Sequence, residues 1–153
     1  AAVIYGNGKD RIELNAPGAV IGTGGIDMGD GDDSFQMSEG QVQSALVQGA
    51  GEDKIEISGG QIGAISQGNG KDDAVITGGV LASLAQGDGY DTFIMKGGTI
   101  TGAFEDGDKA TMTGGTIGRV DMKLDNNLFE MSGGRIIVNL VTGFGNDTIL
   151  ISG

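Results

Sequence analysis

The chain repeats one phrase with a period near 19 residues, and this repeat limits the fold more than any other feature. A full copy reads Gly-x-Gly-x-Asp, then alternating apolar residues, then Gly-Gly-x-Ile, as in residues 49–62. The residues that close the glycine turn are Asp10, Asp33, Asp53, Asp72, Asp91, Asp108, Asn127 and Asp147, at spacings of 23, 20, 19, 19, 17, 19 and 20 residues. A period of this length predicts stacked supersecondary units, each packed on its neighbours.

A short apolar strand follows every turn. The residues two and four places after the turn-closing position are Ile12 and Leu14, Phe35 and Met37, Ile55 and Ile57, Ala74 and Ile76, Phe93 and Met95, Ala110 and Met112, Phe129 and Met131, and Ile149 and Ile151. Because side chains alternate between the faces of a strand, these sixteen residues are predicted to face inward. The outward residues between them are Glu13, Gln36, Glu56, Val75, Ile94, Thr111, Glu130 and Leu150.

The Gly-Gly pair is expected to bend the chain into a second strand that leads back to the next turn. This strand begins at Val42, Ile62, Leu81, Ile100, Ile117 or Ile136 and runs through Ala45, Ile65, Leu84, Ala103 or Val120. Each period thus holds at least two short strands, and successive periods pair in parallel about 4.8 Å apart. The sequence predicts an all-β fold, a right-handed parallel β-helix (β-solenoid) of about eight coils of ~19 residues, the hand following the crossover rule.

Residues 1–153 are expected to form a single β-solenoid segment. The chain begins with Ala1 rather than Met and stops halfway through a repeat at Gly153, so we expect it to be part of a longer surface protein. The 32 glycines lie at fixed phases of the repeat, and 38% hydrophobic content suffices for a thin core. The net charge of −12 argues against nucleic acid and anionic membranes as partners.

The composition excludes the commonest catalytic and metal-binding chemistry. There is no Cys and no His, which removes disulfides, thiolate metal sites and the commonest general base. Acidic residues gather at one corner and along the outward strand face, but acids occur at nearly every corner of this chain. We therefore predict no enzyme activity, no catalytic residues and no cofactor-binding residues; the acidic groups considered are Asp30, Asp32 and Asp33, and Glu13, Glu56 and Glu130.

The glycine turn resembles the calcium-binding nonapeptide of RTX β-rolls, in which Asp carboxylates and backbone carbonyls hold Ca²⁺. Residues 68–75 match all but the leading glycine, which Gln67 replaces, and Lys71 lies beside the Asp. The resemblance would place calcium at Asp33, Asp53, Asp72 and Asp91, with the oxygen ligands that this ion prefers. The alternative, which we favour, is that each Asp accepts backbone N–H groups of its own turn, so that no metal is required.

Two further stripes arise from the repeat. Gln48, Gln67 and Gln86 share one phase, and stacked amides can hydrogen-bond along the rod. Val75 and Ile94 interrupt the polar outward row and are expected to be adjacent in the stack, with Thr111 next. The first stripe is interpreted as structural. The second, which Leu150 extends as a separate interruption, is interpreted as ordinary exposed apolar surface; the alternatives are a small partner-binding patch and an area covered by a corner loop.

The repeat is similar to the passenger region of bacterial autotransporters, particularly adhesin-type members. The likeness spans the whole chain and is carried by residues 58–62, 77–81, 113–117 and 132–136, each Ser/Thr-Gly-Gly-x-Ile/Leu. It implies a non-catalytic rod displayed at the bacterial cell surface that takes part in adhesion, aggregation or display of other domains. A host or neighbouring cell would be the partner, and membrane contact would come only through the family's C-terminal barrel, which these residues do not contain. The alternatives are an RTX-like calcium-binding β-roll and a carbohydrate-active enzyme of the pectin-lyase type.

Overall fold

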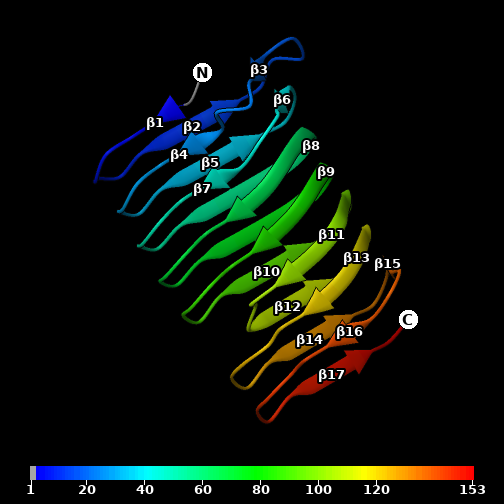
Figure 1. The fold of residues 1–153 in the computed structure, drawn as a ribbon. Helices are drawn as coiled ribbons and strands as arrows, with labels where there is room; N and C mark the ends of the chain where they lie inside the picture. The colour runs from blue at the N-terminus through cyan, green and yellow to red at the C-terminus, as the bar shows by residue number, and fades with distance from the viewer. Residues whose placement is uncertain (1–2) are drawn as a thin grey trace.

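The computed structural model describes residues 3–153 and forms a rod of stacked coils, a parallel β-solenoid (Figure 1). The described residues form seventeen strands and no helix, and none of them provides a helix that could cross a membrane. Strands that share a phase pair in parallel, for example Ile55 with Ala74 and Ile57 with Ile76. The predicted fold class, about eight coils spaced about 19 residues apart, is confirmed.

Each coil contributes to three rows of strands. Sheet A, which follows the glycine corner, contains β2 (Arg11–Leu14), β5 (Ser34–Met37), the starts of β8 (Lys54–Ser66) and β9 (Asp73–Ala85), β10 (Thr92–Met95), β12 (Lys109–Met112), β14 (Leu128–Met131) and β17 (Thr148–Ile151). Sheet B, after the Gly-Gly corner, contains β3 (Val20–Ile21), β6 (Gln41–Val42), the middle of β8 and β9, the starts of β11 (Thr99–Glu105) and β13 (Thr116–Asp121), and β15 (Arg135–Ile136). Sheet C leads back to the glycine corner and contains β1 (Val3–Ile4), β4 (Ile26–Asp27), β7 (Leu46–Val47), the ends of β8, β9, β11 and β13, and β16 (Leu140–Val141).

The bend between sheets B and C takes one more residue in some coils than in others. In β8 the inward residues are Ile62 and Ile65, three apart, whereas in β11 they are Ile100 and Phe104, four apart with a register shift between them. The second strand was expected to run through Ala45 and Ala103, but the residues that hold the inward phase are their neighbours, Leu46 and Phe104. Leu46 pairs with Ile65, and Phe104 pairs with Leu84.

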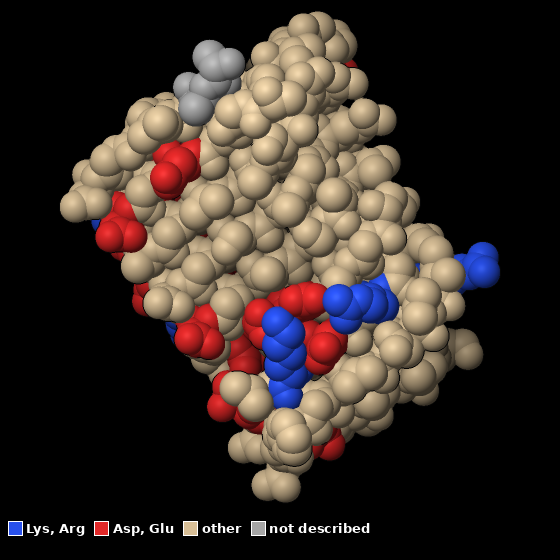
Figure 2. Space-filling model, viewed as in Figure 1, with Lys and Arg blue, Asp and Glu red and all other residues tan. Residues whose placement is uncertain are grey.

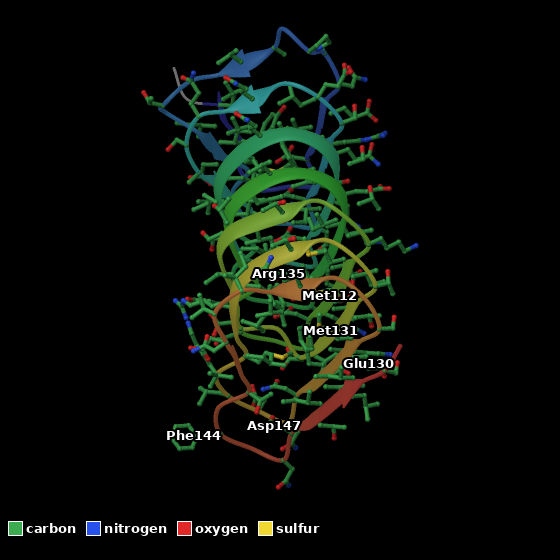
Figure 3. All side chains as sticks on the ribbon, turned by 90° about the vertical axis from the view of Figure 1, so that its right-hand side faces the viewer. Met112, Glu130, Met131, Arg135, Phe144 and Asp147 are labelled. Atoms are coloured by element: carbon green, nitrogen blue, oxygen red, sulfur yellow. The ribbon has the colours of Figure 1, made fainter. Side chains whose placement is uncertain are left out.

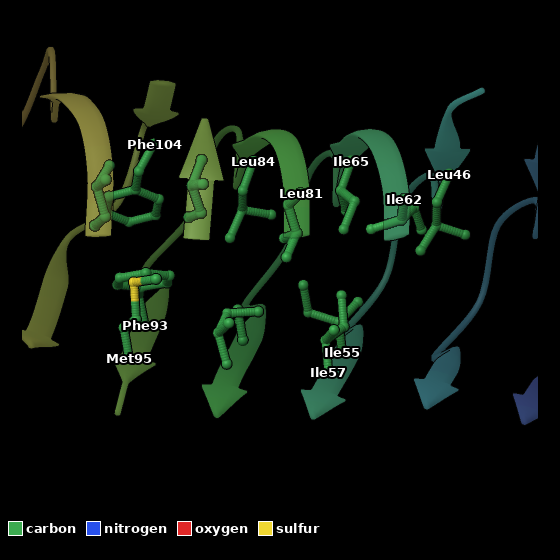
Figure 4. Close-up of a cluster of buried hydrophobic side chains, with 14 of the residues drawn as sticks. Leu46, Ile55, Ile57, Ile62, Ile65, Leu81, Leu84, Phe93, Met95 and Phe104 are labelled. Carbon is green, nitrogen blue, oxygen red and sulfur yellow. The ribbon is translucent and has the colours of Figure 1, made fainter. Parts of the chain in front are cut away.

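The core is a thin layer between sheet A and the two return sheets, as Figure 4 shows. Ile55 and Ile57 from sheet A are 2% and 0% exposed. They meet Ile62 and Ile65 from the return strand of the same coil (Figure 4). Of the sixteen residues predicted to face inward, twelve are buried and Ile12 and Met131 are partly buried against the core.

The prediction failed for the last coil, where Ile149 and Ile151 are 44% and 71% exposed. Their phase is the inward one, because β17 pairs with β14 in the usual register. A core residue in a solenoid is covered by the coils on both sides of it, and residues 3–153 place a coil on only one side of β17. Figure 3 shows this end of the rod, with Met131 inside the stack and Phe144 pointing away from it.

The glycine corner demands glycine for two reasons, seen at Gly68 and Gly70. Both adopt positive φ, +92° and +131°, where other residues are strained. A Cβ on either would also lie 1.9 Å from the carbonyl oxygen of Gly49 or Gly51 in the preceding coil. The corners thus stack backbone on backbone, which fixes the axial register of the rod.

Replacing Ile57 with Asp is expected to destabilise the rod by several kcal/mol, because an unpaired carboxylate would enter the closed core. Far-ultraviolet circular dichroism during chemical denaturation would measure the free energy of unfolding. Ser58→Asp, an exposed change one residue along the same strand, is the matched control and should cost little. Equal effects of the two substitutions would contradict the inward assignment.

Candidate functional site

The glycine corner encloses a column of buried aspartates, the most unusual polar feature of the molecule. In five successive pairs of coils, the carboxylate of one turn-closing Asp accepts a hydrogen bond from the backbone N–H of its counterpart in the preceding coil. The pairs are Asp10 N to Asp33 Oδ1 (2.9 Å), Asp33 N to Asp53 Oδ1 (2.8 Å), Asp53 N to Asp72 Oδ1 (2.9 Å), Asp72 N to Asp91 Oδ1 (2.9 Å) and Asp91 N to Asp108 Oδ2 (2.8 Å).

These bonds differ from the sequence-based expectation in one respect. The turn aspartates were expected to accept N–H groups of their own turn, but their donors lie in the neighbouring coil, 17 to 23 residues away. The carboxylate oxygen therefore serves as an axial link between coils. The sequence of a turn shows which residue carries the carboxylate. Which N–H group donates to it depends on the distance between neighbouring coils, and one repeat does not reveal that distance.

The second carboxylate oxygen of these residues has no partner. Oδ2 of Asp33, Asp53, Asp72 and Asp91 is buried and makes no hydrogen bond, and the four residues are at most 2% exposed. Removal from water raises the pKa of Asp53 and Asp91 to about 7 and that of Asp72 to about 6, and neighbouring carboxylates add to the rise. The N–H bond on Oδ1 opposes this rise but does not outweigh it. Burial also raises the pKa of Asp33 and Asp108.

A column of glutamine amides runs beside the aspartates, as the stripe of Gln48, Gln67 and Gln86 predicts. Gln67 Nε2 donates to Gln48 Oε1 at 3.1 Å, and Gln86 Nε2 donates to Gln67 Oε1 at 3.0 Å. Each amide also donates to a backbone carbonyl six residues ahead, for example Gln86 Nε2 to Thr92 O at 2.8 Å. All three glutamines are fully buried. The structural interpretation of this stripe is confirmed, and the amides in addition tie sheet C to sheet A within each coil.

Both the amide column and the glycine stacking stop at the short corner, residues 105–108. This coil takes 17 residues and has no glutamine of the ladder phase, so Gln86 Oε1 is buried without a partner. The Phe104 ring packs here, within 2.4 Å of where a Cβ on Gly107 would lie, and stacks on Phe93 with ring centroids 4.0 Å apart. An aromatic ring thus fills the corner where polar columns run in the preceding coils.

The next corner, residues 123–127, departs from the glycine pattern. Lys123 and Asp125 adopt positive φ, +62° and +74°, at phases that Gly143 and Gly145 hold in the following coil. Asn127 replaces the turn aspartate, and its Nδ2 donates to the carbonyls of Leu124 at 3.0 Å and Thr142 at 3.1 Å. A carboxylate could not donate these bonds, which explains the change from Asp to Asn at this corner.

A charge network over these two irregular corners was not anticipated from the sequence. Lys123 Nζ contacts Glu105 at 2.9 Å and Asp106 at 3.2 Å, and Arg119 contacts Glu105 at 2.8 Å. The hydrogen bond from Lys123 lowers the pKa of Glu105. Figure 2 shows the cluster as the place on this face where both signs of charge meet. Loss of the glycine pattern at residues 105–108 and 123–127 was the available signal, because corners without glycines need side chains to hold them.

The described residues contain no group of three or more His, Cys, Asp or Glu side chains arranged to hold a metal ion. The aspartates named as possible calcium ligands, Asp33, Asp53, Asp72 and Asp91, lie in one column and each faces a backbone N–H. Two exposed aspartates at the tip of a glycine corner also accept hydrogen bonds from the backbone of the next coil: Asp30 accepts from Ala50 N at 3.1 Å, and Asp32 accepts from Glu52 N at 2.9 Å. The corner acids thus act as hydrogen-bond acceptors between coils.

The outward acids of sheet A are not brought together as a pair. Glu13 and Glu56 lie two coils apart, with Gln36 between them donating to Glu56 at 3.1 Å. Together with Ser38 and Ser58 they line a shallow trough of about 260 Å³. Glu130 lies farther along the rod between Thr111 and Leu150.

The apolar interruption of sheet A is confirmed as a contiguous row. Val75 lies between Glu56 and Ile94, and Thr111 follows Ile94 in the next coil. Ile94 is 37% exposed, so the row is a narrow, partly covered strip. It borders a second trough of about 330 Å³ that Ser34, Lys54 and Thr92 also line.

Comparison with known proteins found no matching family model, no matching curated protein and no matching solved structure.

The buried carboxyls make stability depend on pH. Because their folded pKa values of about 6 to 7 lie above the ordinary 3.8, folding favours the protonated form. This stabilisation is complete below about pH 4 and is lost as the pH rises through 7, so the free energy of unfolding should fall by about 3 kcal/mol or more between pH 5 and pH 8. Denaturant unfolding at a series of pH values measures the change.

The matched variants are Asp53→Asn and Asp88→Asn. Asn at position 53 keeps an oxygen that can accept the hydrogen bond from the Asp33 N–H, but it cannot ionise. The fall in the free energy of unfolding between pH 5 and pH 8 should therefore be smaller in this variant. Asp88 is exposed at a corner tip, and its replacement should leave the loss unchanged. Stability that rises over this pH range would show that the column is ionised and solvated.

Proposed function

We propose that this chain is a non-catalytic structural rod, a segment of a surface-displayed bacterial protein of the autotransporter passenger type that spaces and presents other parts of that protein and contributes to adhesion. The observation that carries the proposal is the use of the buried polar side chains. The aspartate and glutamine columns link one coil to the next along the axis. Such links make a stiff rod whose length is set by the number of coils.

The outward surface supports the same proposal. A carbohydrate-active enzyme of the pectin-lyase type needs acidic and basic groups clustered on one outward sheet over neighbouring coils. Here the sheet A row passes from Glu56 through Val75 and Ile94 to Thr111. Trp is absent from the chain, and Tyr occurs twice, so aromatic platforms for sugar rings are scarce.

A calcium-binding β-roll is the alternative, and one observation favours it. The second oxygen of each of the column aspartates Asp33, Asp53, Asp72 and Asp91 is buried without a hydrogen-bond partner, and a carboxylate oxygen is a ligand that calcium prefers. Raised pKa values offer another explanation, because protonation removes the charge. The two accounts predict different responses to calcium.

A rod function tolerates the removal of a whole coil. Deleting residues 54–72 joins the turn aspartate Asp53 to Asp73, which keeps the repeat in phase, and should shorten the rod by one strand spacing of about 4.8 Å while preserving the fold. With the chain fused between an outer-membrane barrel and an epitope, antibody binding to intact cells should match that of the full-length rod. Deleting residues 54–63 removes half a coil and should abolish display. Polysaccharide cleavage that is lost on Glu56→Gln would overturn the proposal.

Calcium should change the melting temperature very little. An ion held at a hundred times its dissociation constant adds about 2.7 kcal/mol per independent site, which a thermal melt would detect easily. We expect melts with chelator and with millimolar calcium to agree, because Oδ1 of each column aspartate already accepts a backbone N–H. A rise of many degrees with calcium, abolished by Asp72→Asn, would establish the β-roll alternative instead.

A further inference from the structure

In four successive coils, the segment that runs from the Gly-Gly corner to the glycine corner carries no charged side chain. Residues 40–48, 59–67, 78–86 and 97–104 contain no Asp, Glu, Lys or Arg. At the chain's average of 20% charged residues, these thirty-five positions would hold about seven charges. We call this surface the neutral face. Figure 2 shows it as a broad uncoloured area between the acidic corner and the Arg119–Lys123 cluster.

The neutral face belongs to the middle of the rod and not to its ends. It spans β6, β7, β8, β9 and β11, which have paired strands on both sides. Its outward side chains are small or uncharged: Gln61, Ala64 and Ser66 in one coil, and Val80 and Ala82 in the next. A shallow hollow of about 330 Å³ lies on it, lined by residues that include Gln41, Gln61, Gly63, Val80 and Ala82.

These side chains suit an uncharged protein surface better than a charged or sugar partner. Glycine, alanine and serine let two sheets approach to about 10 Å, the usual distance between packed sheets. A charged partner would find no ion-pair partner among these thirty-five residues, and a sugar would find no Trp or Tyr. A copy related by a two-fold axis presents the same uncharged side chains and the same hollow.

The distribution of charge makes this surface the one at which two copies of the chain can meet. A molecule of net charge −12 repels its own copies, and the acids of the glycine corner and the charges of sheet A sharpen that repulsion. Two neutral faces can meet without bringing like charges into contact. Four coils at about 4.8 Å by some 25 Å of return strand give roughly 500 Å² per copy, or about 1,000 Å² in total, which is the lower limit of specific interfaces.

We propose that the neutral face is a self-association surface, through which two copies of this rod bind face to face in a weak two-fold dimer. The proposal stands apart from the function proposed above, because it concerns purified chains and does not require that the rod be displayed on a cell.

Sedimentation velocity tests the dimer directly. We expect the dimer fraction to grow with concentration in the micromolar to millimolar range. We also expect it to grow between about 50 mM and about 500 mM NaCl, because salt screens the repulsion between the acidic rods. Ala82→Glu places two like charges in each two-fold interface and should weaken the dimer about tenfold or more. Ile94→Glu adds the same charge on sheet A and should leave the dimer unchanged.

A cysteine provides a second readout that does not depend on the stability of the glutamate variant. The chain has no cysteine, so Ala82→Cys introduces a unique thiol, which should form a disulfide-linked dimer under mild oxidation, whereas Ile94→Cys should not. A monomer at millimolar concentration in both salts would overturn the proposal. Loss of the dimer on Ile94→Glu would move the interface to sheet A. Oligomers larger than two that survive Ala82→Glu would assign association to the open strand edges instead.

Discussion

The structure depends on one constraint: each coil stacks on the previous coil with residues of the same phase in contact. At the glycine corner the contact is closest, with the Cβ positions of Gly68 and Gly70 lying 1.9 Å from carbonyl oxygens of the coil before. A residue in such a rod is chosen largely by its compatibility with its own counterpart one period away. Glycine meets glycine, an Asp carboxylate meets an Asp N–H, and a Gln amide meets a Gln amide.

This constraint explains how much of the molecule could be read from the sequence. The period-two pattern around Ile55 and Ile57 identified sheet A and its inward face, because burial on one face leaves a direct trace in residue type. The glutamine ladder around Gln67 could be predicted because its members occupy the same position in successive repeats. The bend between sheets B and C left no such trace, since three or four residues can span it, and so the inward phase of Leu46 and Phe104 could not be read from the repeat.

The candidate site was predictable by location and not by bonding. The turn signature marked Asp53 and Asp72 as special, but a local turn and an axial link require the same residue at the same place. The choice between them depends on the distance to the next coil, which no single repeat encodes. The Lys123–Glu105 pair was missed for a related reason, because it replaces a backbone contact that the shortened corner removed.

The uneven placement of charge follows from the same architecture. Many of the acidic residues lie at the glycine corners, where backbone N–H groups of adjacent coils donate hydrogen bonds to their carboxylates. The neutral face of the middle coils carries no charge. The formal charge of −12 also counts Asp53, Asp72 and Asp91, whose pKa values lie near 6 to 7. The rod at neutral pH therefore carries less negative charge than its composition indicates.

The short corner has a consequence for how the rod comes apart. The glutamine column ends at Gln86, the glycine-corner backbone bonds end with Gly70 N to Asp88 O, and the aspartate column reaches Asp108 without a bond to Asn127. Three of the axial connections cease within about one coil, leaving the sheet ladders and the ion pairs of Lys123 and Arg119 with Glu105 to join the two coils. In a one-dimensional array, cooperativity extends only as far as the coupling between neighbours. We therefore expect local opening to begin at this seam, where the axial hydrogen-bond columns are interrupted.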